Sequence, residues 1–393
     1  MIKREKYLKQ IRGFYDSDLV KVIVGIRRSG KSFILQQIMD EIKVKTDNII
    51  YLNFERTSDY LKASDSNELV NYINENRKEG KCYIFLDEIQ EVKNWHLAVK
   101  DLRLNNNSIF ITGSNSKLLS SEITSYLSGR YVSFRIRPFI YKEIIELSKE
   151  LNFNLDLNDY LVWGGMPGRF YLGQSEQQIF LKDLEETIIY NDLIKRYKIQ
   201  KVVVFKKIVK FILQHNSRIF SARSIQKYVN QECESTSINT VIKYINYLKE
   251  AYIIDSISQY SRKAKKELSY YEKIYDADVC FNSLSVTNNR FDLDHNLENI
   301  VFNELLYMGY EVKVFDNNSK EVDFFATKNG KEYFIQVAYS VVDQKAYDRE
   351  LGAFAGLSPL TKKILITNDS IDYSTSTIKH IQFRDFLTLD CLD

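Results

Sequence analysis

A phosphate-binding motif lies near the start of the chain, in the stretch GIRRSGKS at residues 25–32. Its G-x-x-x-x-G-K-S spacing is typical of a loop whose glycines let the backbone curl around phosphate oxygens, while the following helix adds partial positive charge at its N-terminus. We expect Lys31 to reach the β- and γ-phosphates of a nucleotide and Ser32 to ligate Mg²⁺. The alternative is a strand–turn–helix that matches the motif by chance.

A pair of acids, Asp87 and Glu88, ends the apolar run KCYIFLDE further along the chain. Such a run is typical of a parallel strand buried on both faces, and ligands bind at the carboxyl ends of these strands. We expect Asp87 to hold Mg²⁺ through water and Glu88 to polarise the attacking water. A solvated strand end is the alternative. The residues predicted to bind ATP are Gly25, Ile26, Arg27, Arg28, Ser29, Gly30, Lys31, Ser32 and Asp87.

Two further residues are candidates for the same reaction. Asn115 follows the apolar stretch SIFIT and would orient the attacking water beside the γ-phosphate, although a turn or helix cap is the alternative. Arg130 would act as an arginine finger on the ATP of a neighbouring subunit, which requires a homo-oligomer. A surface arginine is the alternative. With Glu88, these two residues complete the predicted catalytic set.

A second group of polar residues lies in the C-terminal stretch EVDFFATKNGKEYFIQVAYS. The Asn329-Gly330 pair between two alternating runs predicts a β-hairpin, because both turn residues take positive φ. Its first strand carries Asp323, and its second carries Gln336 and Ala338. A metal-dependent nuclease would need a carboxylate and a lysine at the last two positions. Gln336 is a weak Mg²⁺ ligand, and Ala338 has no ammonium group.

The segments around this hairpin predict an αβββαβ order, the core of the PD-(D/E)xK nuclease-like fold. A helix with Glu298 precedes the hairpin, and a helix near 343–356 and the strand KKILIT follow it. Glu298, Asp323 and Gln336 are therefore interpreted as the residues of a vestigial nuclease site. We expect a structural or protein-binding platform in which Asp323 pairs with a nearby lysine.

The middle of the chain carries an excess of positive charge. Residues 201–275 contain 14 Lys and Arg against 6 Asp and Glu, whereas residues 276–393 contain 11 against 19. This asymmetry indicates that any contact with nucleic acid is made by the middle and not by the C-terminal part.

Three helical patterns, followed by two strands that flank SRKAKKELSYY, predict a winged helix-turn-helix in this basic region. In the third helix we expect an apolar face that includes Ile242, with Tyr244 on the opposite face. A winged helix that only packs between domains is the alternative. The residues predicted to contact DNA are Lys243, Arg262, Lys263, Lys265 and Lys266.

Composition excludes several classes of protein. Apolar residues make up 44% of the chain and charged residues 27%, as in ordinary globular proteins, and no apolar run is long enough to span a membrane. The N-terminus lacks the apolar region of a secretion signal. The four cysteines and four histidines are scattered, which argues against a zinc site or a disulfide framework. We expect a cytoplasmic protein.

Five stretches together resemble the prokaryotic AAA-fold ATPase family that is fused to a C-terminal restriction-endonuclease-like domain. They are GIRRSGKS, FLDEIQEVKNW, TGSNSKLL, LSGRYVSFRIRPFIYKE and WGGMPG, and the similarity runs through nearly the whole chain. The resemblance implies an AAA-type fold, ATP hydrolysis with Mg²⁺ and a two-part C-terminal region.

The predicted fold class is α/β, with four parts. These are a P-loop AAA-type ATPase core at 1–138, a helical lid at 139–200, a winged helix-turn-helix at 201–275 and an inactive PD-(D/E)xK nuclease-like domain at 276–393. We expect an ATP-hydrolysing protein that uses ATP and Mg²⁺, associates with DNA through residues 201–275, and has an unidentified protein partner but no membrane contact. Two other interpretations stay open: a nucleotide-gated protein-interaction module with slow or no turnover, and an ATP-dependent nuclease.

Overall fold

The structure is a computed structural model of the chain. It describes residues 2–113, 127, 129–232, 235–260, 272–286, 290–317 and 320–392. The chain divides into two compact units, the first made of Met1–Pro138 and Glu250–Tyr252 and the second of Phe139–Lys249 and Ile253–Asp393. Among the helices of the described residues, none is long and apolar enough to cross a membrane.

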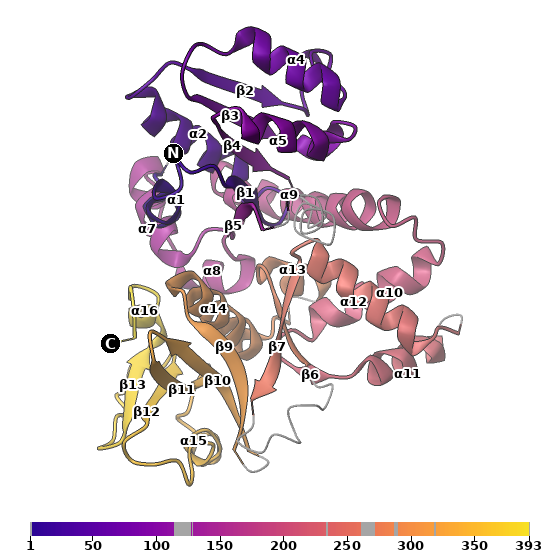
Figure 1. Ribbon diagram of the computed structural model, residues 1–393. Helices are drawn as coiled ribbons and strands as arrows, with labels where there is room; N and C mark the ends of the chain where they lie inside the picture. The colour runs from indigo at the N-terminus through magenta and orange to yellow at the C-terminus, as the bar shows by residue number, and fades with distance from the viewer. Residues whose placement is uncertain are drawn as a thin grey trace. The chain divides into compact units, whose positions relative to one another are not determined.

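The first unit is built on a parallel five-stranded sheet with the strand order β2-β3-β4-β1-β5 (Figure 1). Every residue of β1, β3 and β4 is buried, which explains why these strands read as apolar runs in the sequence. The strands are β1 (Val20–Val24), β2 (Ile49–Asn53), β3 (Cys82–Asp87), β4 (Asn107–Thr112) and β5 (Tyr131–Arg135).

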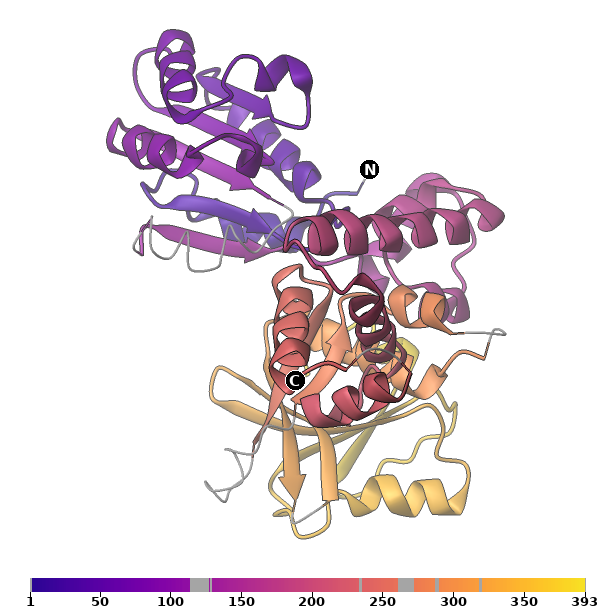
Figure 2. The same cartoon turned by 90° about the vertical axis from the view of Figure 1, so that its right-hand side faces the viewer.

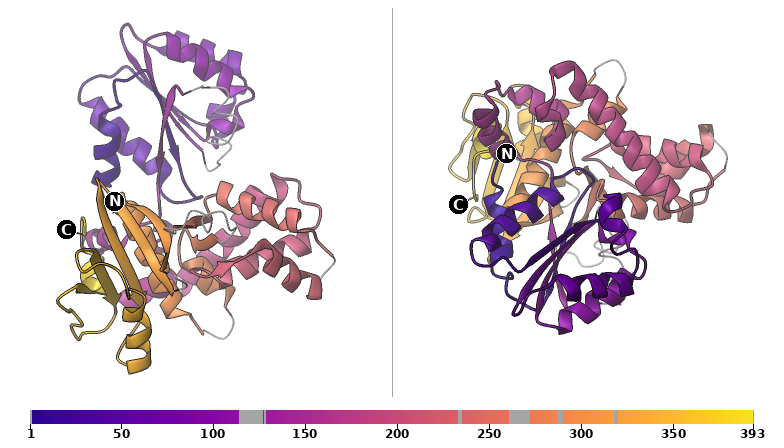
Figure 3. Two further views of the ribbon diagram at one scale, coloured as in Figure 1. Left: turned by 60° about the horizontal axis from the view of Figure 1, so that its bottom comes forward. Right: turned by 90° about the horizontal axis from the view of Figure 1, so that it is seen from above.

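Helices cover both faces of this sheet (Figure 3), as right-handed connections between parallel strands require. Helix α2 follows β1, and its buried stripe includes Ile34, Leu35, Ile38 and Ile42. Helix α1 packs against α2, and α4 packs against α5. The helices are α1 (Glu5–Arg12), α2 (Lys31–Lys43), α3 (Thr57–Tyr60), α4 (Ser66–Asn76) and α5 (Trp95–Leu104), with the short η1 (Ile89–Glu91).

The register of the sheet brings three strand ends to one edge. Ile23 of β1 pairs with Thr112 of β4, and Leu86 of β3 pairs with Ile111 of β4. Because these strands are parallel, the loop after β1, the last residue of β3 and the last residue of β4 lie side by side.

The second unit begins with helices and continues into a mixed sheet. Its first helices are α7 (Tyr141–Leu151), α8 (Leu157–Trp163), η3 (Pro167–Tyr171), α9 (Gln174–Thr187) and η4 (Ile188–Lys195). Three helices follow and form one cluster (Figure 2): α10 (Val202–Gln214), α11 (Ala222–Glu232) and α12 (Ile238–Glu250). Phe211 of α10 packs against Tyr228 of α11.

The face of α12 differs from the expectation at two residues. Tyr244 is 7% exposed, and its ring lies 4.9 Å from that of Phe205 of α10, whereas Ile242 is 41% exposed. The prediction that Ile242 is buried and Tyr244 exposed is therefore wrong. The stripe Val241, Tyr244, Ile245 and Leu248 follows the i, i+3, i+4, i+7 spacing of one helix face, and Ile242 lies off that stripe.

An eight-stranded sheet with the order β13-β12-β11-β10-β9-β7-β8-β6 forms the rest of the second unit. Strand β7 pairs in parallel with β9 through Gln259↔Val314 and Tyr260↔Phe315. One sheet therefore contains strands from both sides of the domain boundary that was expected between residues 275 and 276. Its strands are β6 (Ile219–Phe220), β7 (Ile254–Tyr260), β8 (Glu272–Asp276), β9 (Glu311–Asn317), β10 (Lys320–Lys328), β11 (Lys331–Ala338), β12 (Lys362–Thr367) and β13 (Ile378–Gln382).

The C-terminal elements follow the expected αβββαβ order. They are α14 (Leu293–Met308), β9, β10, β11, α15 (Gln344–Gly352) and β12, with α13 (Cys280–Ser285) before them and α16 (Phe383–Phe386) near the end. The hairpin between β10 and β11 turns at Asn329 (φ 51°) and Gly330 (φ 76°), so the predicted turn is confirmed.

The close approach at the end of β1 generates a prediction for Gly25→Ala. A Cβ atom on Gly25 would lie 2.1 Å from the carbonyl oxygen of Ile136, and Gly25 has a φ of +144°. We expect the free energy of unfolding, measured with urea on the full chain, to fall by about 3 kcal/mol.

The matched control is Gly13→Ala. Gly13 has a φ of −61°, and an added Cβ would meet no atom within 4 Å. We expect this variant to change the free energy of unfolding by less than about 0.5 kcal/mol. Equal losses in the two variants would contradict the steric requirement at Gly25.

Candidate nucleotide-binding site

The loop between β1 and α2 has the backbone conformation of a phosphate cradle. Gly25, Arg28 and Gly30 have positive φ values of 144°, 65° and 98°. Helix α2 begins at Lys31 directly after the left-handed Gly30, so its first-turn N–H groups face the concave side of the loop. This arrangement presents backbone donors and the positive end of a helix dipole to an anion.

Side chains hold the loop in this shape. The Lys31 ammonium group donates to the carbonyl oxygens of Gly25 (3.2 Å) and Ile26 (3.1 Å). Arg4, which is 3% exposed, donates to the carbonyl oxygens of Ser29 (3.1 Å) and Arg137 (3.0 Å). Arg4 therefore ties the phosphate-binding loop to the end of the first unit. No sequence pattern indicated this role for Arg4, since Arg4 lies before the first strand and outside any motif.

Asp87 lies fully buried at the end of β3. Its Oδ1 accepts a hydrogen bond from the Thr112 hydroxyl, and its Oδ2 accepts from Tyr51 (3.2 Å) and Asn53 (3.3 Å). Ser32 also hydrogen-bonds to this carboxylate. Burial raises the pKa of Asp87, while the hydrogen bonds from Thr112 and Ser32 act in the opposite direction. The loop and the first of the two acids thus meet directly.

Thr112 connects the two acids. Its Oγ1 donates to Asp87 and accepts from the backbone N–H of Glu88 at 3.0 Å. The polar residue predicted at the end of this strand was Asn115, three residues later. Asn115 lies outside the described residues. The signal for Thr112 was its position as the last residue of the apolar run SIFIT.

Glu88 has an unusual backbone conformation for a residue with a side chain. Its φ of 55° and ψ of 47° are left-handed, a state that costs of order 1 kcal/mol and persists where the surroundings impose it. The Glu88 carboxylate accepts a hydrogen bond of 2.5 Å from the Gln90 amide. Strand β3 ends at Asp87, and the short helix η1 begins directly after Glu88.

The residues at this edge fit a magnesium-bound nucleotide. The hydroxyl of Ser32 and the carboxylate of Asp87 are oxygen donors in contact with each other, and Mg²⁺ prefers oxygen ligands, usually one or two from the protein with phosphates and waters completing the shell. The loop supplies N–H donors and an ammonium group for the phosphates. The predicted residues after β1, at the end of β3 and at the start of α2 therefore converge at one place. Thr112, which was not predicted, joins them from the end of β4.

Arg130 is not part of this convergence. It is exposed and immediately precedes β5, and its carbonyl oxygen accepts from the N–H of Val20 at the start of β1. The phosphate-binding loop follows the other end of β1, roughly 15 Å away for a five-residue strand. Within its own subunit Arg130 is thus remote from the nucleotide, and only a neighbouring subunit could use it.

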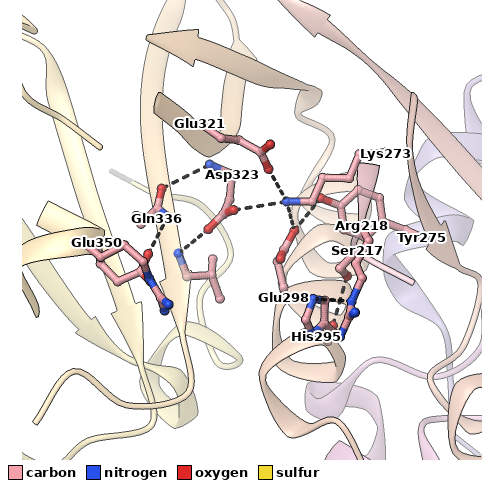
Figure 4. A network of polar contacts seen from close by, with 12 residues as sticks. Ser217, Arg218, Lys273, Tyr275, His295, Glu298, Glu321, Asp323, Gln336 and Glu350 are labelled. Carbon is pink, nitrogen blue, oxygen red and sulfur yellow. Dashed lines mark hydrogen bonds and ion pairs between the residues drawn. The ribbon is translucent and has the colours of Figure 1, made fainter. Parts of the chain in front are cut away.

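The three predicted vestigial residues of the second unit do lie together (Figure 4). Asp323 donates its backbone N–H to the Gln336 side chain (3.2 Å), and Lys273 of β8 pairs with both Asp323 (3.2 Å) and Glu298 (2.7 Å). The expectation that Asp323 pairs with a lysine is confirmed. Lys273 lies on a strand fifty residues earlier in the chain, so no local sequence pattern indicated that it contacts Asp323.

Two further acids belong to this cluster. Glu321 shares the β10 strand with Asp323 two residues away, so alternation along the strand could have identified it. Glu350 of α15 accepts a 2.6 Å hydrogen bond from the Gln336 amide. The cluster borders a cavity of about 570 Å³ lined mainly by polar and charged side chains, including Asp294, His295, Lys320 and Arg349.

Of the residues predicted to contact DNA, only Lys243 is described. It is exposed on α12, with its ammonium group 5.7 Å from the centre of the Tyr247 ring. Arg262, Lys263, Lys265 and Lys266 lie outside the described residues.

The link between the acids generates a prediction for Thr112→Val. The valine keeps the shape of the side chain but leaves the buried Asp87 carboxylate without one donor. We expect the free energy of unfolding to fall by about 2 kcal/mol in urea denaturation. We also expect the affinity for Mg²⁺ and ATP to fall. Thr57→Val, at an exposed threonine of the same unit, is the control and should have almost no effect. Wild-type stability in Thr112→Val would contradict the assigned role.

Comparisons with known proteins agree with this geometry. A family model described as an AAA domain matches residues 17–145, and one described as a domain of unknown function (DUF8612) matches residues 154–288. A Walker-type ATPase of Pyrococcus abyssi has a similar fold, with a TM-score of 0.50 and 16% identity over 72% of this chain and 96% of that chain.

Two uncharacterized proteins are similar over most of their length. One from Haemophilus influenzae is 33% identical, and the match covers 93% of this chain and 93% of that protein. One from Methanocaldococcus jannaschii is 31% identical and covers 89% of this chain and 82% of that protein. The chain therefore belongs to the family of P-loop proteins with an AAA domain that includes these two proteins.

Proposed function

We propose that the first unit binds and hydrolyses ATP with Mg²⁺. The observation that carries this proposal is the hydrogen-bonded link from Asp87 through Thr112 to the backbone of Glu88, beside the phosphate-binding loop. Nucleotide binding alone needs the loop and an oxygen ligand for the metal. A second acid held at a fixed place next to them is the additional feature that hydrolysis requires.

Each residue has a separate role in this proposal. Lys31 leaves the carbonyl oxygens of the loop and binds the β- and γ-phosphates. Ser32 and Asp87 would hold Mg²⁺, which would neutralise charge on the phosphates. Glu88 accepts a hydrogen bond from the attacking water and aligns it with the γ-phosphorus. The Thr112 hydroxyl favours the ionised form of Asp87 through its hydrogen bond, and its oxygen accepts the backbone N–H of Glu88.

Two substitutions separate binding from hydrolysis. Lys31→Ala removes a charged donor to phosphate, so we expect the dissociation constant for ATP to rise about 100-fold. Glu88→Gln keeps the shape of the site but cannot polarise water, so ATP should bind normally while phosphate release falls about 100- to 1000-fold.

Glu91→Gln is the matched control, because Glu91 is an exposed acid three residues beyond Glu88. It should turn over ATP at the wild-type rate. Tight binding without phosphate release in the wild type would favour the nucleotide-gated interaction module instead. Unchanged turnover in both Lys31→Ala and Glu88→Gln would overturn the proposal.

We also propose that residues 201–275 contact DNA as a winged helix. The support is the order of elements: α10, β6, α11, α12 and the β7–β8 hairpin, with β6 pairing antiparallel to β8. This order is typical of winged helix-turn-helix domains. The region has the basic excess that phosphate contacts require, and its exposed side chains include Arg223 and Lys227 of α11 and Lys243 of α12.

The salt dependence of binding tests this second proposal. Replacing Arg262, Lys263, Lys265 and Lys266 together by alanine should weaken binding of duplex DNA to the full chain. The slope of log K against log salt should become shallower by about 3 to 4. A control with alanine at Lys331, Lys345, Lys362 and Lys379 removes the same charge from the acidic C-terminal part and should leave the slope unchanged. Equal effects of the two variants would contradict a DNA contact through the hairpin.

A further inference from the structure

A buried lysine stands at the centre of the carboxylate cluster of the second unit (Figure 4). Lys273 of β8 is 3% exposed. Its ammonium nitrogen lies 2.7 Å from Glu298 of α14, 2.7 Å from Glu321 and 3.2 Å from Asp323, both of β10. Three carboxylates from two elements therefore share one fixed positive charge.

The residues of this cluster do not fit a magnesium ion. Oδ1 of Asp323 faces Lys273, and Oδ2 accepts the backbone N–H of Val337 at 2.9 Å. The Gln336 side chain is also engaged at both ends, by the N–H of Asp323 and by Glu350. In the described part of the chain, no three acidic, histidine or cysteine side chains are arranged to hold a metal ion.

The electrostatics agree with the geometry. Burial alone would lower the pKa of Lys273, but Glu298 and the neighbouring acids hold it well above its usual value, so the ammonium charge persists at neutral pH. Burial also acts to raise the pKa of Glu298, and the adjacent Lys273 ammonium group opposes that rise. A divalent cation would have to approach this ammonium group closely and compete with it for the same carboxylates.

We infer that the ammonium group of Lys273 takes the place of the metal ion in this nuclease-like site, so that the cluster is an internal ionic joint and not a metal-dependent catalytic centre. The sequence has no lysine at position 338, but Lys273 of β8 brings an ammonium group into the cluster. This group neutralises the acids that would otherwise bind the cation.

The joint has a structural task. Among the described residues, strands β7 and β9 pair at Gln259↔Val314 and Tyr260↔Phe315. Lys273 adds ionic contacts from β8 to β10 and α14. Tyr275, two residues along the same strand, donates to Glu298 at 2.7 Å, and its ring stacks on that of Phe302 at 4.1 Å. The hairpin that carries the proposed DNA contacts is thereby anchored to the C-terminal sheet.

Counting bound Mn²⁺ by electron paramagnetic resonance, on the full nucleotide-free chain, tests the inference. Wild type and Asp323→Asn should bind the same number of ions, because neither has a site in the cluster. Lys273→Met should bind one additional ion, and the double variant Lys273→Met/Asp323→Asn should lose it again. Lys379→Met, at an exposed lysine of β13 in the same sheet, should match wild type.

Two results would overturn the inference. The first is an ion bound by wild type and lost in Asp323→Asn, or Mg²⁺-dependent cleavage of plasmid DNA that this variant abolishes. The second is a folded Lys273→Met, judged by circular dichroism, that gains no ion. If Lys273→Met does not fold, the comparison of wild type with Asp323→Asn decides alone. Glu321→Gln, at a carboxylate whose side chain is 34% exposed, repeats that comparison if Asp323→Asn is unstable.

Discussion

A fully buried carboxylate at the end of β3 is the constraint on which the first unit depends. An ionised Asp87 is stable without solvent only when polar groups surround it. Those groups come from separate elements: Tyr51 and Asn53 from β2, Thr112 from β4 and Ser32 from α2. The need to satisfy one charge therefore holds two neighbouring strand ends and the phosphate-binding loop at a common edge. A cation that replaces some of these donors would find its ligands already in place.

The second unit satisfies its buried acids in a different way. Hydrogen-bond donors around Asp87 are neutral and leave a net negative charge for a metal ion, whereas the cluster at Asp323 contains a permanent cation from Lys273. An ammonium group attached to the chain cannot dissociate as a metal ion can. The contacts of Lys273 therefore hold the strands together and do not supply a metal ion for catalysis. The two sites are both rich in carboxylates, and what distinguishes them is the charge of the partner that each acid already has.

The sequence predicted the parts that depend on local spacing. The phosphate-binding loop, the acids at the end of β3 and the Asn329-Gly330 turn are each defined by neighbouring residues, and the structure has them in the expected elements. It could not predict contacts made by distant segments. Lys273 reaches Asp323 across fifty residues, and Arg4 reaches Ser29 from before the first strand. The exchange of Ile242 and Tyr244 on α12 had a similar cause, because Tyr244 is buried by the packing of its ring against Phe205 of α10, a contact from a distant part of the chain.

The most direct test of the central claim is the release of inorganic phosphate from ATP by the purified wild-type chain, measured with Mg²⁺ and with EDTA in a single-turnover format. We expect prebound ATP to be cleaved with Mg²⁺ present and to remain intact in EDTA, because Ser32 and Asp87 require the cation to engage the phosphates. Bound ATP that stays uncleaved through the full time course with Mg²⁺ would contradict hydrolysis by this unit. Glu88 would then not activate water for attack on the γ-phosphate.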